Sequence, residues 1–89
     1  MPFDVEIVAP HKKVEKRAKK LILPGVEGDL GVLSGHAPLI TALRSGKITV
    51  VGENFREYYK VDSGVLQVRP SGVSIVAGNF EEVDPGAEA

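Results

Sequence analysis

The clearest strand pattern of the sequence lies in Val65-Leu66-Gln67-Val68-Arg69-Pro70-Ser71-Gly72-Val73-Ser74-Ile75-Val76-Ala77. On both sides of the central Pro-Ser-Gly, polar and apolar residues follow a two-residue pattern, which is typical of β-strands with one buried face. A proline with a glycine two residues later suits a short turn between two such strands. This stretch therefore predicts a β-hairpin in which Val65–Arg69 pairs with Val73–Ala77.

The same alternation recurs outward from this hairpin in both directions. Phe3, Val5 and Ile7 share one face of a first strand, which Pro10 closes. From Val14 to Leu23 the pattern is irregular at first and apolar at the end, so we expect an edge strand or bulge followed by core, with Pro24-Gly25 ending the strand. Further strands are predicted by similar patterns at 30–33, 39–43, 47–50, 57–61 and 79–83.

Turn signals at intervals of roughly 8–12 residues, without any helical periodicity, predict an all-β fold, a small antiparallel β-sandwich or barrel. The 89 residues support a single domain, and 43% hydrophobic with 26% charged residues is an ordinary globular composition. The absence of cysteine excludes disulfides and a thiolate nucleophile, and it favours a reducing intracellular compartment. The apolar runs are far shorter than the ~20 residues of a membrane-spanning helix.

The charges are unevenly distributed although the net charge is only −1. Six of the 11 basic residues lie between Lys12 and Lys20. Such a segment suits an acidic protein surface or a nucleic acid, but it contains no aromatic residue that would stack on bases. Alternatively, it is a solvated edge strand whose lysines prevent pairing with other sheets.

The motifs that catalysis would require are not formed. Gly31-Val32-Leu33-Ser34-Gly35 has its first glycine three residues before the serine, whereas a nucleophile elbow has it two before. Gly25, Gly28 and Gly31 do not have the spacing of a phosphate-binding loop. The two histidines, His11 and His36, lie far apart in sequence and suggest no metal site. We therefore expect no catalytic, cofactor-binding or metal-binding residues.

Two polar features are better explained as contact residues. Glu27 and Asp29 lie in a glycine-rich segment that predicts a tight exposed loop with positive φ at one or more positions. In such a loop both carboxylates are ordinarily charged and solvated. His36 either hydrogen-bonds its own turn or meets a carboxylate or carbonyl of a partner.

A longer set of motifs resembles a known family. It comprises Gly28-Asp29-Leu30-Gly31-Val32, Ser34-Gly35-His36-Ala37-Pro38-Leu39, Thr41-Ala42-Leu43 with Ser45-Gly46, and Val61-Asp62-Ser63-Gly64-Val65-Leu66-Gln67-Val68. Together these resemble the epsilon subunit of the F-type ATP synthase over nearly all of its N-terminal domain. One departure is Val14–Ala18, which stands where members commonly have an apolar residue and a glycine.

The resemblance implies a ten-stranded β-sandwich at the foot of the rotating central stalk, without catalytic residues or a cofactor of its own. It implies that Glu27, Asp29 and Leu30 meet the polar loops of the membrane c-ring, and that His36, Leu39 and Thr41 meet the gamma subunit. An acidic loop suits a basic c-ring surface by electrostatic complementarity. The implied location is peripheral, on the cytoplasmic face of the bacterial inner membrane or its organelle equivalent, with no nucleic acid bound.

The resemblance also divides the chain. Residues 1–83 are expected to form the sandwich, and residues 84–89 a linker toward a C-terminal helical hairpin that family members carry and this sequence lacks. An inhibitory role of such helices is therefore not assigned to these residues. The rival hypothesis is a stand-alone β-sandwich binding module that uses the Lys12–Lys20 segment on an acidic partner or RNA.

Overall fold

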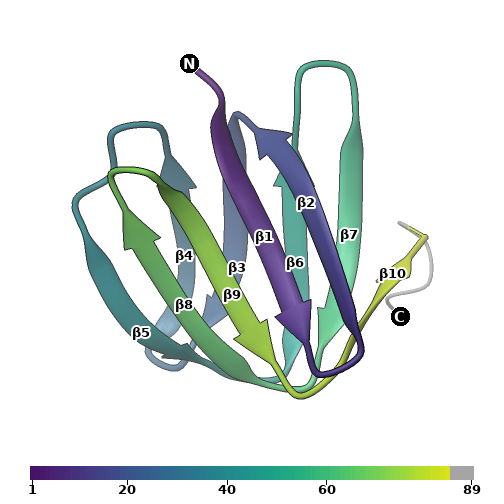
Figure 1. Ribbon diagram of the computed structural model, residues 1–89. Coiled ribbons are helices and arrows are strands. Elements are labelled where there is room, and N and C mark those ends of the chain that lie inside the picture. Colours follow the sequence, from purple (N-terminus) through teal and green to yellow (C-terminus); the bar gives the residue numbers. More distant parts are fainter. Residues whose placement is uncertain (85–89) are drawn as a thin grey trace.

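A computed structural model describes residues 1–84 of the chain, and in these residues it contains ten β-strands and no helix (Figure 1). The all-β prediction is thereby confirmed. The strands are β1 (Phe3–Ala9), β2 (Lys12–Ala18), β3 (Lys20–Gly25), β4 (Gly28–Leu33), β5 (Leu39–Leu43), β6 (Gly46–Val51), β7 (Arg56–Val61), β8 (Gly64–Arg69), β9 (Gly72–Ala77) and β10 (Phe80–Val83).

The strands form one curled sheet in the order β10-β7-β6-β3-β5-β8-β9-β1-β2, with β4 paired to the other edge of β3. The curl places two layers face to face, as Figure 1 shows: β5, β8, β9, β1 and β2 lie in front of β3, β4, β6 and β7. The layers connect where β3 meets β5 through the single pair Gly25 and Leu43. The expected sandwich is therefore a sheet folded over onto itself.

The β-hairpin predicted from Val65–Arg69 and Val73–Ala77 forms. β8 and β9 pair antiparallel from Gly64 opposite Ala77 to Arg69 opposite Gly72. Gly72 has a φ of +149°, a conformation that side-chain-bearing residues rarely adopt. One pairing departs from the antiparallel prediction, because β1 lies parallel to β9. These two strands are distant in sequence, so no hairpin turn fixes their relative direction.

The segment from Val14 to Leu23 contains parts of two strands where the sequence predicted one irregular strand. β2 ends at Ala18, and β3 begins at Lys20. Pro24 and Gly25 are the last two residues of β3, so the strand ends there as predicted, and the turn follows at Val26-Glu27. A Cβ atom at Gly25 would lie 2.6 Å from the carbonyl oxygen of Gly28. This glycine is therefore required for close packing inside the hairpin.

The core lies between the two layers and consists of the residues that alternation placed on the inner faces. Ile48, Val50, Leu66 and Ile75 are fully buried. Other members of the core are Val5, Ile7, Leu21, Leu23, Val32, Leu43, Tyr59, Val61, Val68, Val73 and Phe80. Among the residues that the structure covers, none belongs to a helix with the length and hydrophobicity needed to cross a lipid bilayer.

Candidate interaction surfaces

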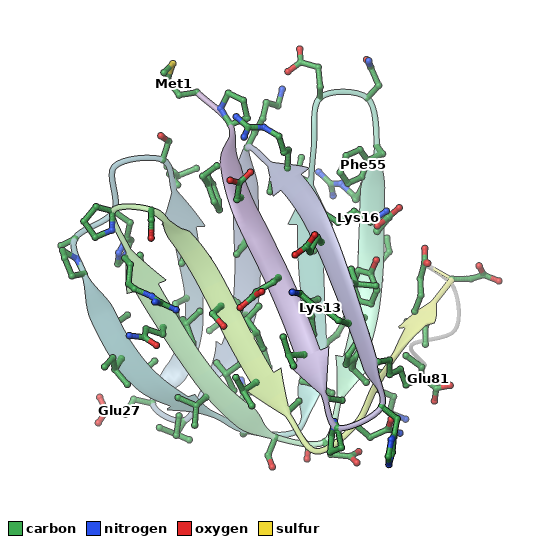
Figure 2. The ribbon with its side chains drawn as sticks, in the orientation of Figure 1. Met1, Lys13, Lys16, Glu27, Phe55 and Glu81 are labelled. Carbon is green, nitrogen blue, oxygen red and sulfur yellow. The ribbon has the colours of Figure 1, made fainter. Side chains whose placement is uncertain are left out.

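The β3–β4 hairpin ends in an exposed tip, which we define as Val26, Glu27, Gly28 and Asp29. Gly28 has a φ of +131°, so the positive φ that the glycine spacing predicted is confirmed. The side chain of Val26 is 54% exposed, and Glu27 is exposed beside it. Figure 2 shows Glu27 pointing away from the sandwich. The tip therefore offers an apolar and an acidic side chain to the outside.

Asp29 is exposed but has a partner within the domain. Its Oδ1 accepts a hydrogen bond of 2.7 Å from Nη2 of Arg44, which follows β5. Two backbone bonds hold the same region: the amide of Arg44 donates to Pro24 over 2.9 Å, and the amide of Val26 donates to Ala42 over 3.2 Å. The tip is consequently fastened to the end of β5.

Leu30 is the third residue expected to face the c-ring. It lies opposite Leu23 in the β3–β4 ladder and packs against the hydrophobic core as a half-buried side chain. The three residues are therefore brought together on one hairpin in different environments: Glu27 is free in solvent, Asp29 is ion-paired, and Leu30 is partly covered.

His36 lies in the exposed loop between β4 and β5. Its Nδ1–H donates to the carbonyl of Ala37 over 2.7 Å in the tautomer that this contact requires, and its amide donates to Leu33 over 3.1 Å. The preceding Gly35 has a φ of +81°. Of the two roles considered for His36, the structure shows the hydrogen bond within its own turn and leaves the ring exposed.

β5 divides its side chains between two faces. Leu39 and Thr41 lie opposite Val68 and Leu66, two residues of the core, so both project toward the interior and are half-buried. Ile40 lies on the other face and is 68% exposed. The outward face of this strand was not singled out from the sequence.

Ile40 lies opposite Gln67 and shares its face of β5 with Ala42, so it borders a row of outward apolar residues. The sheet register places Ala42, Val65, Val76 and Val8 side by side across β5, β8, β9 and β1. Val65 is 47% and Val76 53% exposed. We call Ile40, Ala42, Val65, Val76 and Val8 the outer apolar face. The sequence contains a signal for it, because the pairs Leu39-Ile40, Val65-Leu66 and Ile75-Val76 place apolar residues on both faces of a strand.

The basic segment forms the edge strand β2 and the start of β3. Arg17 binds Asp4 over 2.7 Å, and Lys13 lies 3.5 Å from Glu6 and 3.1 Å from Glu15. These contacts occupy the outer face of the strand. They support the edge-strand interpretation and leave less free positive charge for an acidic partner or RNA.

Two lysines of β2 point toward the opposite layer. Lys12 donates to the carbonyl of Phe80 and lies 5.1 Å above the ring of that residue. Lys16 lies 3.3 Å from Glu57 and 5.8 Å from the ring of Phe55 (Figure 2). Inward-pointing charges on an edge strand are a common device against pairing with foreign sheets. These lysines therefore close one side of the sandwich and protect its edge.

Tyr59 connects the ion pair of Lys16 and Glu57 to the core. Its hydroxyl donates to Oε1 of Glu57 over 2.8 Å while the residue is 2% exposed. Burial, followed by the hydrogen bond and the negative charge of Glu57, raises the pKa of Tyr59. The hydroxyl therefore stays protonated in the folded chain well beyond the range of an exposed tyrosine.

A groove of about 490 Å³ lies over β1, β2 and β9. Two small outward residues of β9, Gly72 and Ser74, line it between charged neighbours. Ser74 donates to Glu6 over 3.0 Å inside it. Within residues 1–84 no three histidine, cysteine, aspartate or glutamate side chains lie close enough to hold a metal ion.

The sequence and the fold of the chain were compared with those of known proteins, and both find matches. Residues 2–83 match the family described as ATP synthase, Delta/Epsilon chain, beta-sandwich domain. The chain is 44% identical over 77 residues to the ATP synthase epsilon chain of Chromohalobacter salexigens, covering 84% of this chain and 55% of that protein. It is 38% identical to the epsilon chain of Trichodesmium erythraeum over 85 residues, covering 94% and 62%.

Solved structures agree on the fold. A chain of the Euglena gracilis mitochondrial ATP synthase (OSCP/F1/c-ring) superposes with a TM-score of 0.85 at 19% identity, over 93% of this chain and 56% of that one. A chain of the Tetrahymena thermophila mitochondrial ATP synthase central stalk and c-ring gives a TM-score of 0.79 at 12% identity, over 98% and 77%. The sequence described here spans little more than half the length of the epsilon chains that it matches.

Proposed function

Because the chain belongs to the family of ATP synthase Delta/Epsilon chain β-sandwich domains, we propose that it is a non-catalytic central-stalk subunit that couples the catalytic head of an F-type ATP synthase to the membrane c-ring. In this role it works by packed contacts with the gamma subunit and with the polar loops of the c-ring. It is peripheral to the membrane, on the cytoplasmic face in a bacterium or the equivalent face in an organelle.

The observation that carries this proposal is the combination of an acidic hairpin tip with an apolar sheet face on one β-sandwich domain. A monomeric soluble domain rarely leaves large apolar side chains grouped on one sheet face unless they meet a partner. Here Ile40, Val65 and Val76 are all about half exposed or more. The acidic tip lies beside this face, since Val26 bonds to Ala42.

We assign the two partners to two different surfaces of the domain. Glu27, Asp29 and Leu30 lie on the hairpin that faces the c-ring loops, where an acidic tip complements basic or hydrogen-bond-donating side chains. His36, Leu39 and Thr41 lie along the β4–β5 loop and β5 and face gamma, and the outer apolar face extends that contact. Leu39 and Thr41 contribute through the open edge of β5, because their side chains lean toward the interior.

Reconstitution tests this proposal. ATP synthase stripped of this subunit is expected to regain coupling between ATP hydrolysis and ion pumping when the chain is added, and the chain is expected to co-purify with gamma. Asp29→Lys should weaken attachment to the membrane sector, because it reverses a charge of the tip and breaks the bond to Arg44, while its circular dichroism stays unchanged. Glu53→Lys is the matched control, because Glu53 is an exposed acid in the turn between β6 and β7. Failure to co-purify with gamma would refute the proposal.

A further inference from the structure

We infer that Arg44 is a positioning residue that clamps the hairpin tip onto β5, and that Glu27, and not Asp29, is the carboxylate that the tip presents to a partner. The contact between Arg44 and Asp29 lies within the domain and does not depend on any partner. Only the identity of the partner, the c-ring loops, rests on the proposed function.

The clamp ties the β4 side of the turn to the strand end that already holds the β3 side. Pro24 lies opposite Asp29 in the β3–β4 pairing, but its carbonyl accepts from the amide of Arg44 and therefore points toward β5 and away from β4. The neighbouring Gly28 has an unusual backbone conformation, and the space where its Cβ would be is empty to 4 Å. The β4 side of the turn therefore has few contacts of its own, and the Arg44 side chain supplies one.

Arg44 is itself well anchored. Its amide donates to the carbonyl of Pro24 over 2.9 Å, and the preceding Leu43 pairs with Gly25. Its guanidinium then reaches Asp29 over 2.7 Å. Both side chains are about half exposed or more, and exposed ion pairs contribute little to global stability. The contact thus serves the position of the tip and adds little to the stability of the domain.

The charge balance distinguishes the two acids. Glu27 and Asp29 bring two negative charges to the tip, and Arg44 neutralises one of them at Asp29. Glu27 has no hydrogen-bond or ion-pair partner among the described residues, and Figure 2 shows it projecting outward. One free carboxylate next to the 54% exposed Val26 fits a partner surface with a cation or amide donor beside an apolar contact.

The clamp is tested on the chain by amide hydrogen exchange. Arg44→Gln should speed exchange at the Val26 amide about two- to fivefold, the range that exposed ion pairs support, while exchange at Leu66 in the core stays unchanged. The charge-swapped double variant Asp29→Arg with Arg44→Asp should restore slow exchange at Val26. Unchanged exchange in Arg44→Gln would overturn the clamp.

The role of Glu27 is tested by the affinity of the chain for ATP synthase stripped of this subunit. Glu27→Gln should weaken binding about tenfold, as loss of a hydrogen bond to a charged group does, with Val26 exchange unchanged. The charge-swapped double variant should bind within about twofold of the parent, because Glu27 and the tip position are kept. The opposite ranking, tight binding by Glu27→Gln and loss in the swap, would overturn the assignment. If the parent itself fails to bind, the proposed function is wrong, whereas the clamp is still decided by the exchange rates.

Discussion

Lys16 Nζ lies 3.3 Å from Glu57 Oε2, and this ion pair joins β2 of one layer to β7 of the other. The second carboxylate oxygen of Glu57 accepts from the hydroxyl of buried Tyr59 over 2.8 Å. Within residues 1–84, β2 pairs only with β1, and the side of the sandwich beyond it is thus closed by side chains. The lysines that gave the sequence its basic segment therefore also hold the layers together.

Glu57→Gln should destabilise the domain by about 1–3 kcal/mol, because it leaves the Lys16 ammonium without its charged partner and weakens the bond to Tyr59. Urea unfolding followed by circular dichroism measures this change. Glu15→Gln is the matched control, since Glu15 pairs with Lys13 on the exposed outer face, and its effect should stay below about 0.5 kcal/mol. Equal effects of the two substitutions would show that the bridge between the layers is energetically unimportant.

Because of Tyr59, the free energy of unfolding of the domain should change with pH in the alkaline range. Its pKa is raised in the folded chain, mainly by burial, so above the unfolded value near 10 the unfolded chain releases a proton that the folded chain keeps. The contribution is complete below pH 10 and is lost as pH rises, with a slope of about 1.4 kcal/mol per unit. Urea midpoints between pH 9 and 11 should fall less steeply for Tyr59→Phe than for the parent. Tyr58→Phe, on the opposite face of β7, is the control for the removal of a tyrosine hydroxyl.

Much of the fold follows from the sequence because a two-layer β domain reveals its inner face by alternation. Ile48 and Val50 were placed on one face in this way, and both are fully buried. Alternation does not indicate which strands pair when those strands are distant in sequence. The parallel contact of β1 with β9 and the crossing at Gly25 and Leu43 arise only when the sheet curls.

The interaction surfaces were predictable to a different degree. The exposed acidic tip follows from its glycines, because a turn with positive φ is encoded locally. The environment of Asp29 does not, since its partner Arg44 lies 15 residues away and meets it only through the β3–β5 crossing. Likewise, the apolar row beside Ile40, formed by Ala42, Val65 and Val76, arises only when β5, β8 and β9 are set in register.

Gly64→Ala should destabilise the domain by about 1–3 kcal/mol, the usual result of forcing extra volume into a packed site. A Cβ at this position would collide with the carbonyl oxygen of Val76 on the adjacent strand, a backbone atom that cannot rotate away. Gly78→Ala is the control, because a Cβ there would meet no atom within 4 Å. Thermal unfolding should separate the two variants, and equal melting temperatures would contradict the close approach of β8 and β9.

Ile40→Lys should weaken association with gamma while leaving the domain folded. The side chain is 68% exposed, so the substitution changes little inside the domain, but it places a charge in the outer apolar face. If a partner covers Ile40, losing that burial costs about 1.5–3 kcal/mol, which corresponds to at least tenfold in affinity. Co-purification and titration with gamma measure the effect. Glu81→Gln, on exposed β10 of the other layer, changes the net charge by the same amount and should bind normally. Equal affinity of both variants would show that the apolar face is not covered by gamma.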